Sequence, residues 1–220
     1  MGSVIGDILP LAVGIAISPI PIIAAILMLL SPKAKGTSVG FLLGWVIGIV
    51  VAVVVFTLLA SVLPEQDPDA AKPVSGVIKI VLGVLLLLVG IRQWRGRGGQ
   101  HDAPKWMAAI DDFTFPKALG LGFLLSGVNP KNLIIAAGAG LIIGSSAVGV
   151  GGDAAAIALF TVIASSTVAI PVLAHLVTAE RMTRPLESLR KWLQDNNATV
   201  MATMILVIGV VLVGKGVSGL

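Results

Sequence analysis

Long runs of apolar residues, separated by short polar segments, dominate the chain. The runs are close to or above the roughly 20 residues that a helix needs to cross a membrane. They do not alternate with polar residues, as the strands of a membrane barrel would. The pattern predicts an all-α integral membrane protein with six transmembrane helices, at approximately Val4–Leu30, Thr37–Leu63, Val74–Ile91, Ala118–Gly144, Ala154–Val177 and Ala198–Val213.

Two of the predicted spans contain residues that disrupt a helix. Ser18-Pro19-Ile20-Pro21 lies within the first span, and Asn129-Pro130-Lys131-Asn132 lies within the fourth. Proline has no backbone N–H for the helix ladder, so closely spaced prolines break or kink a helix. A charged side chain at the membrane centre costs about 3 kcal/mol or more. We therefore expect helices 1 and 4 to be interrupted, with a simple proline kink as the alternative for helix 1.

The two interrupted segments also indicate an internal repeat. Residues 18–23 align with residues 129–134, and each half of the chain has three spans, so the second half would enter the membrane upside down. Such inverted repeats are typical of transporters with a central binding site. We predict one membrane domain, residues 1–220, made of two inverted three-helix repeats. The predicted parts are the first repeat at 1–91, a cytoplasmic basic loop at 92–117, and the second repeat at 118–217, which includes an interfacial amphipathic helix at 180–195.

Composition and charge add a topology. Hydrophobic residues make up 56% of the chain and charged residues 12%, against about 25% charged residues in soluble domains. Eleven of the fifteen Lys and Arg residues lie in the first, third and fifth loops, which places these loops in the cytoplasm and both termini outside. The net charge of +4 follows from this topology, so we do not expect nucleic acid as a partner. Four tryptophans are expected at or near the inner face: Trp45, Trp94, Trp106 and Trp192.

Glycines recur at every fourth residue of the second span, at Gly36, Gly40, Gly44 and Gly48. This spacing places all four on one helix face, where small residues let another backbone approach closely. We interpret them as helix-packing residues. Their partner is either another helix of the same chain or a second subunit, which would make the protein a homo-oligomer.

The interruptions together predict a substrate-binding site near the membrane centre. Its expected residues are Ser18, Pro19, Pro21, Asn129, Pro130, Lys131 and Asn132. All eleven Asp and Glu residues lie in loops or at the ends of spans, so a buried Lys131 has no carboxylate partner within the spans. It would be neutral, reach water, or be neutralised by an anionic ligand. Helix N-termini also favour anions. We prefer the anionic ligand; the alternative is that Lys131 extends to the membrane surface and has no role in binding.

Several other kinds of chemistry are not expected. There is no cysteine, which excludes disulfides and thiol redox carriers. A metal transporter normally needs acidic or imidazole ligands within its spans. His101-Asp102 and Asp111-Asp112 lie in a polar loop and are more typical of solvated side chains than of metal ligands. Without a Ser/His/Asp set or an HExxH motif, we expect no enzymatic activity, no cofactor and no metal.

In combination, these motifs resemble the lysine exporter (LysE) superfamily. Within it, Ser31-Pro32-Lys33-Ala34, the segment Gly40–Trp45 and the segment Asn129–Leu133 are most similar to the GAP family of peptidoglycolipid or sulfolipid addressing proteins. The resemblance implies a six-span, multi-pass protein of the bacterial cytoplasmic (inner) membrane that moves cell-envelope lipids or supports their export. One difference from the amino-acid exporters is that Pro19-Ile20-Pro21 stands where they typically have Pro-Gly-Pro.

These observations lead to a functional hypothesis. We expect a membrane transporter or transport accessory for anionic cell-envelope lipids or glycolipids, which cross near the paired interruptions. The alternatives are an exporter of amino acids or small ions and a non-transporting scaffold for lipid-export machinery. Expected partners are membrane lipids, a large lipid-export transporter, and a second copy of the chain bound through the glycine face.

Overall fold

The computed structural model describes residues 1–62, 68–96, 107, 109–146 and 148–218. Across these residues the chain is helical and contains no strand. A short 3-10 helix, η1, precedes the second half of the chain. The elements are α1 (Gly2–Ala16), α2 (Pro19–Leu29), α3 (Ala34–Val62), α4 (Pro68–Gly96), η1 (Ile110–Asp112), α6 (Phe115–Gly127), α7 (Pro130–Gly144) and α8 (Gly149–Val217).

Four helical segments among the described residues are long and apolar enough to cross a membrane. They lie in α3, in α4 and in two parts of α8, Gly149–Val177 and Thr183–Val217. Two further spans form if each bent pair of helices crosses as one unit, with a bend of 52° between α1 and α2 and of 61° between α6 and α7. The structure thus confirms an all-helical, multi-pass chain with interruptions at both predicted places.

The boundaries of α4 differ from the predicted ones. This helix begins at Pro68, before the predicted start at Val74, and continues to Gly96, inside the predicted loop 92–117. Proline is tolerated at the first helical position, and the polar residues Arg92, Gln93 and Arg95 form helix readily once the apolar run has ended. η1 and the start of α6 also lie within the predicted loop, whereas residues 97–106 and 108 are outside the described part of the chain.

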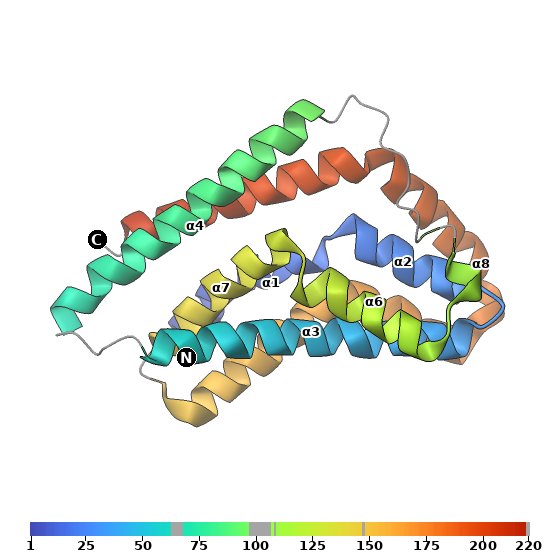
Figure 1. Ribbon diagram of the computed structural model, residues 1–220, viewed down its shortest axis with the longest axis horizontal. Helices are drawn as coiled ribbons and strands as arrows, with labels where there is room; N and C mark the ends of the chain where they lie inside the picture. The colour runs from blue at the N-terminus through green and yellow to red at the C-terminus, as the bar shows by residue number, and fades with distance from the viewer. Residues whose placement is uncertain (63–67, 97–106, 108, 147, 219–220) are drawn as a thin grey trace.

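The predicted interfacial helix at 180–195 is not a separate element. It is part of α8, which runs the length of the molecule and then turns back (Figure 1). Leu186 and Leu193, two turns apart, are buried against α2 residues, whereas Leu189 and Trp192 are exposed. The apolar face of this segment therefore packs against protein.

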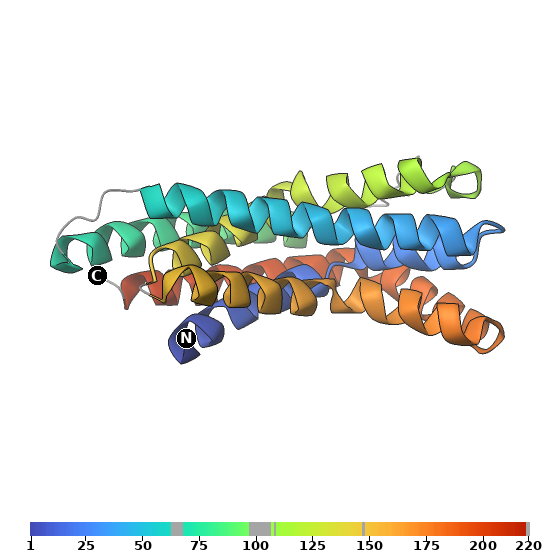
Figure 2. The same ribbon diagram turned by 90° about the horizontal axis from the view of Figure 1, so that it is seen from below.

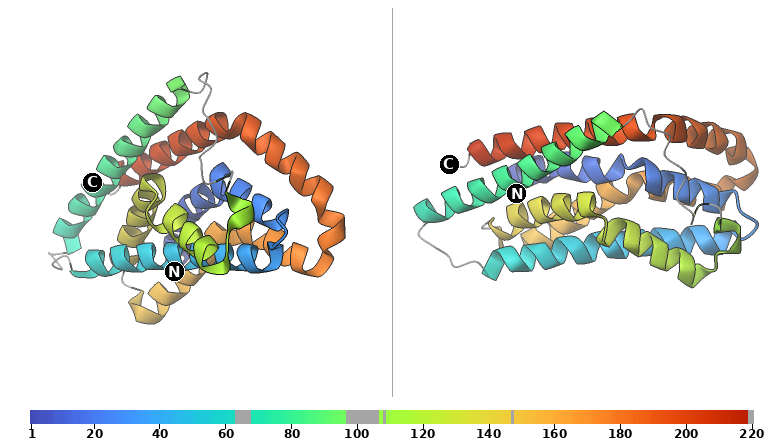
Figure 3. Two further views of the ribbon diagram at one scale, coloured as in Figure 1. Left: turned by 45° about the vertical axis from the view of Figure 1, so that its right-hand side comes forward. Right: turned by 45° about the horizontal axis from the view of Figure 1, so that its top comes forward.

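The helices run between two ends of an elongated bundle. In Figure 1 both termini lie toward the left, whereas the α2–α3 turn and the reversal of α8 lie at the right. α3 packs against α6, as Figure 2 shows, and α4 runs beside the returning part of α8 in both views of Figure 3. The first and fifth connections thus lie at one end of the bundle and both termini lie at the other. This arrangement agrees with the predicted alternation in the direction of the spans.

A core of fully buried side chains joins the first helix to α3, α7 and α8. Trp45 is one of its largest members, with 1% of its surface exposed and its ring stacked on Phe41 at a centroid distance of 6.4 Å. Trp45 therefore faces the protein interior and not lipid, because the adjacent glycines bring α6 over this part of α3. Its depth in the membrane stays a prediction. Trp94 and Trp192 are exposed, and Trp106 lies outside the described residues.

The glycine face of α3 packs against α6 of the same chain. A Cβ atom added to Gly44 would lie 1.9 Å from the carbonyl oxygen of Leu119, and one at Gly40 would lie 2.7 Å from that of Phe115. At Gly48 the added atom would be 2.0 Å from the Ser126 hydroxyl oxygen. Gly36, in contrast, has open space around it. Because α6 occupies the face at Gly40, Gly44 and Gly48, a second copy of the chain has no access to it there.

This contact predicts a position-dependent cost of adding one methyl group. Gly44→Ala forces α3 and α6 apart and should lower the stability by about 1–3 kcal/mol, the usual cost of overpacking. Gly36→Ala is the matched control and should leave the unfolding temperature unchanged. Thermal unfolding of both purified variants in the same detergent checks this; equal melting temperatures would contradict the close contact.

Candidate functional site

The two helix interruptions meet through Lys131. This residue lies in the first turn of α7, and its Nζ atom donates to the carbonyl oxygen of Gly14 at 3.0 Å and to Oγ of Ser18 at 2.5 Å. The Lys131 side chain is buried, with 6% exposed, and Ser18 is buried as well. Two motifs more than a hundred residues apart in sequence thus form a single polar junction inside the bundle.

The junction satisfies backbone groups that the first break releases. Helix α1 ends at Ala16, and the Ile17 N–H is the last to pair with it, at the Val13 carbonyl. The carbonyl groups of Gly14 and Ala16 therefore need donors from elsewhere. Lys131 supplies one donor, to Gly14, and the Thr167 hydroxyl from α8 supplies another, to the Ala16 carbonyl at 2.6 Å. A cationic group at a helix C-terminus is also favoured by the helix dipole.

The other residues of the Asn-Pro-Lys-Asn motif pair with backbone groups at the second break. The side chain of Asn129 accepts a hydrogen bond from the Lys131 backbone N–H at 3.0 Å and caps α7. Pro130 occupies the first helical position, where its missing N–H costs nothing. Asn132 Nδ2 donates to the carbonyl oxygen of Leu125 in the last turn of α6 at 3.0 Å. Each polar side chain of the motif therefore pairs with backbone at a helix end.

Two polar side chains at the junction have hydrogen-bonding groups that are not used. An ammonium group has three N–H donors, of which Lys131 uses two, and no carboxylate of the described residues interacts with it. Oδ1 of Asn132 is buried and has no hydrogen-bond partner. The junction therefore holds a buried cation and an open acceptor near each other along α7.

The prolines contribute backbone geometry and no polar contact. Pro19 and Pro21 are buried at the start of α2, whereas Pro130 is exposed. Two of the first three residues of α2 lack an N–H, and Ser18 does not cap this helix. The expected attraction of anions by the N-terminus of α2 is therefore weaker than an ordinary helix start would provide.

An acidic residue near the end of the first span forms an ion pair that the sequence did not predict. Asp7 lies in α1 and forms an ion pair with Lys215 of α8. Lys79 of α4 interacts electrostatically with both of them. The sequence signal for this cluster was the acidic residue Asp7 about one turn inside an apolar run. The signal for Thr167 was its place in a run of three hydroxyl residues, 165–167.

The acidic and histidine pairs do not form a metal site within the described part of the chain. No group of three His, Asp or Glu side chains is found together there. Asp111 and Asp112 are exposed in η1, whereas His101 and Asp102 lie outside the described residues.

The capping role of Asn129 can be tested by substitution. Asn129→Ala removes the side-chain acceptor at the start of α7 and should destabilise the protein by about 1 kcal/mol. Asn129→Ser retains an acceptor at the same position and should recover most of the loss. Thermal unfolding of both variants measures the difference, and an alanine variant as stable as the serine variant would argue against the cap.

Comparison with known proteins gives a family. Neither the curated proteins nor the solved structures gave a significant match to the chain. A family model described as Sap, sulfolipid-1-addressing protein, matches residues 8–218, which include both helix interruptions, the glycine face and Lys131. Since the match covers nearly the whole length, the chain belongs to the sulfolipid-1-addressing protein family.

Proposed function

We propose that this protein takes part in the export of anionic cell-envelope lipids or glycolipids across the bacterial cytoplasmic membrane. Its family is described by the addressing of a sulfolipid, a lipid with a negatively charged headgroup. Four to six apolar helices provide the membrane domain that such a role needs. Membership of the lysine exporter superfamily, the inverted relation of the two halves and the outward orientation of both termini belong to this proposal.

The observation that carries the proposal is the position of Lys131. A buried ammonium group lies where two interrupted helices meet, it lacks a carboxylate partner, and one of its donors is unused. Polar and ionisable side chains inside a membrane are costly and mark substrate pathways. A negatively charged headgroup passing the junction would supply the missing counter-charge and accept hydrogen bonds from the unused Lys131 donor and the Ser18 hydroxyl.

A purely structural role for Lys131 makes a different prediction. In that case the ammonium group serves only to cap α1 through the Gly14 carbonyl. Replacement of Lys131 would then change stability, because a buried carbonyl without a donor costs about 1–3 kcal/mol, and lipid movement would change only as far as the fold does. Transport and stability therefore have to be measured on the same variants.

The experiment compares lipid movement in proteoliposomes. Lys131→Met keeps the length of the side chain and removes its charge; Lys117→Met, on an exposed residue of α6, is the matched control. We expect Lys131→Met to slow the transbilayer movement of fluorescent phosphatidylglycerol at least tenfold, and Lys117→Met to leave it unchanged. A folded Lys131→Met variant that moves lipid at the wild-type rate would remove Lys131 from the pathway.

Two further measurements separate the other functions. Saturable counterflow of a soluble amine or acid in the same vesicles would favour an exporter of small solutes. Comparison of envelope lipids from cells with and without the protein tests lipid export directly. A scaffold makes a third prediction. The Lys131 variant would restore export in cells, and variants that no longer co-purify with a large transporter would not. We propose no enzymatic step in any of these roles.

A further inference from the structure

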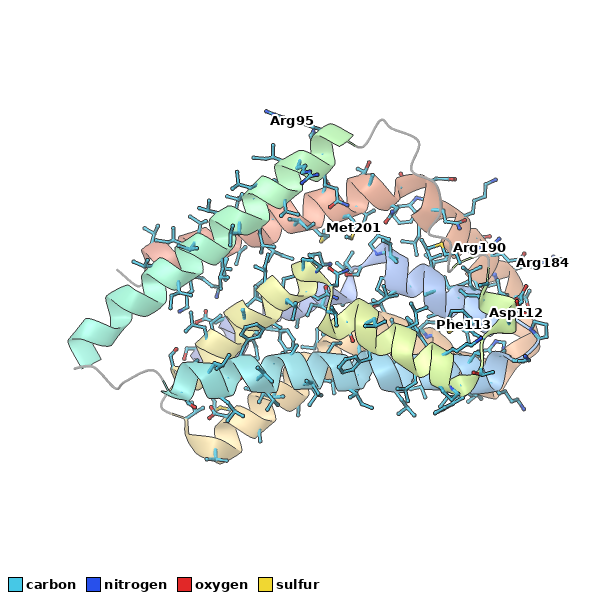
Figure 4. The ribbon with its side chains drawn as sticks, in the orientation of Figure 1. Arg95, Asp112, Phe113, Arg184, Arg190 and Met201 are labelled. Atoms are coloured by element: carbon cyan, nitrogen blue, oxygen red, sulfur yellow. The ribbon has the colours of Figure 1, made fainter. Side chains whose placement is uncertain are left out.

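A cavity of about 660 Å³ opens at the end of the bundle opposite the termini. Its walls come from the α2–α3 turn with the start of α3, from the segment that leads into α6, and from the α8 residue His175. Figure 4 shows Phe113, one of the lining residues, at this end of the molecule. The cavity is separate from the Lys131 junction, since the two share no residue.

The polar groups of the cavity are suited to an anion. Lys33 and Lys35 are exposed and form no ion pair with the described residues, and no acidic residue belongs to the lining. The Thr114 hydroxyl does not cap α6, although Thr114 precedes this thirteen-residue helix directly. Two cationic residues and an unused hydroxyl therefore line one space. Pro116, the second residue of α6, has no N–H, so the N-terminus of this helix adds less than an ordinary helix start.

The imidazole of His175 adds a further uncommitted polar group. Its Nδ1 atom is buried and has no hydrogen-bond partner, although the ring lines the cavity. Buried polar atoms are almost always paired in native proteins. Asp111 and Asp112, which directly precede the lining residue Phe113, are exposed and lie outside the lining. The balance of charge in the cavity itself is therefore positive.

Apolar surface continues from the cavity along α3. Gly36 is part of the lining, and Leu43, seven residues later, points within about 20° of the same direction on a helix of 3.6 residues per turn. Leu43 and Ile47 are exposed, as is Phe115 at the cavity. An anionic group held in the cavity would thus have an apolar stripe beside it, on which an acyl chain can lie.

We propose that this cavity binds the phosphate or sulfate ester headgroup of an anionic lipid, with its acyl chain on the Leu43–Ile47 stripe. The proposal rests on the function proposed above and adds a loading site at the basic end of the bundle. Lys33 and Lys35 neutralise the headgroup, and the Thr114 hydroxyl donates to one of its oxygens. The ester anion is shared by lipids and by free phosphate, but only a lipid uses the apolar stripe.

Binding to the purified full-length protein in detergent tests this proposal. The probes are dioleoyl phosphatidic acid, dioleoyl phosphatidylcholine and inorganic phosphate, titrated while bound lipid is counted by native mass spectrometry. Lysines near anionic lipid each favour binding about fivefold, so Lys33→Gln with Lys35→Gln should weaken phosphatidic acid binding roughly 10- to 30-fold. Gly36→Phe places a ring in open space at the cavity and should weaken it similarly without removing charge.

The control removes the same charge from the same end of the molecule. Arg184→Gln with Lys191→Gln changes two exposed residues outside the lining and should bind phosphatidic acid like the wild type. Equal loss in the control would overturn the proposal in favour of a general surface charge effect. Wild-type binding by the Gly36→Phe variant would overturn the cavity as the site. Competition by inorganic phosphate as strong as that by phosphatidic acid would overturn the lipid as the ligand.

The readout also separates this proposal from the transport function. Equilibrium binding at the cavity does not require lipid to cross the membrane, and none of these variants alters the Lys131 junction. Failure to bind at the cavity therefore overturns the loading site alone. Failure of the vesicle assay in the wild-type protein would overturn transport, whatever the cavity binds.

Discussion

The constraint on which this structure depends is that a backbone carbonyl inside hydrocarbon needs a donor. A continuous helix meets this requirement with its own N–H groups, but an interrupted helix does not. Lys131, Thr167 and Asn132 each direct a side chain at a carbonyl near a break. Two of these three bonds join different spans, so the demand for donors also fixes how α1, α7 and α8 are placed against one another.

The second organising contact has almost no side chains in it. α3 and α6 approach so closely at Gly44 and Gly122 that added Cβ atoms would meet backbone on the opposite helix. Without a hydrophobic driving force between helices in lipid, such close backbone packing is an effective means of association. The interrupted fourth span is thereby held along α3, with its break facing α1 and its first residues beside the basic cavity.

Sequence reasoning predicted the elements better than their partners. The two breaks were visible because two closely spaced prolines, or a proline among polar residues, disfavour a regular helix inside an apolar run. Gly40, Gly44 and Gly48 were visible because their period matches a helix face. The pairing of Lys131 with Gly14 was not visible, since a carbonyl carries no signature in the sequence. Asp7 was missed because its partner Lys215 is 208 positions away, and Trp45 because burial depends on the helix that covers it.

The prolines at the two breaks limit how this protein can change shape. Pro19, Pro21 and Pro130 lack the N–H groups that would be needed to join α1 to α2, or α6 to α7, into straight helices. No ligand or voltage can supply those atoms. Straightening either interrupted span would therefore leave backbone carbonyl groups without their usual donors, which favours movement by rotation of the half-helices about the two breaks.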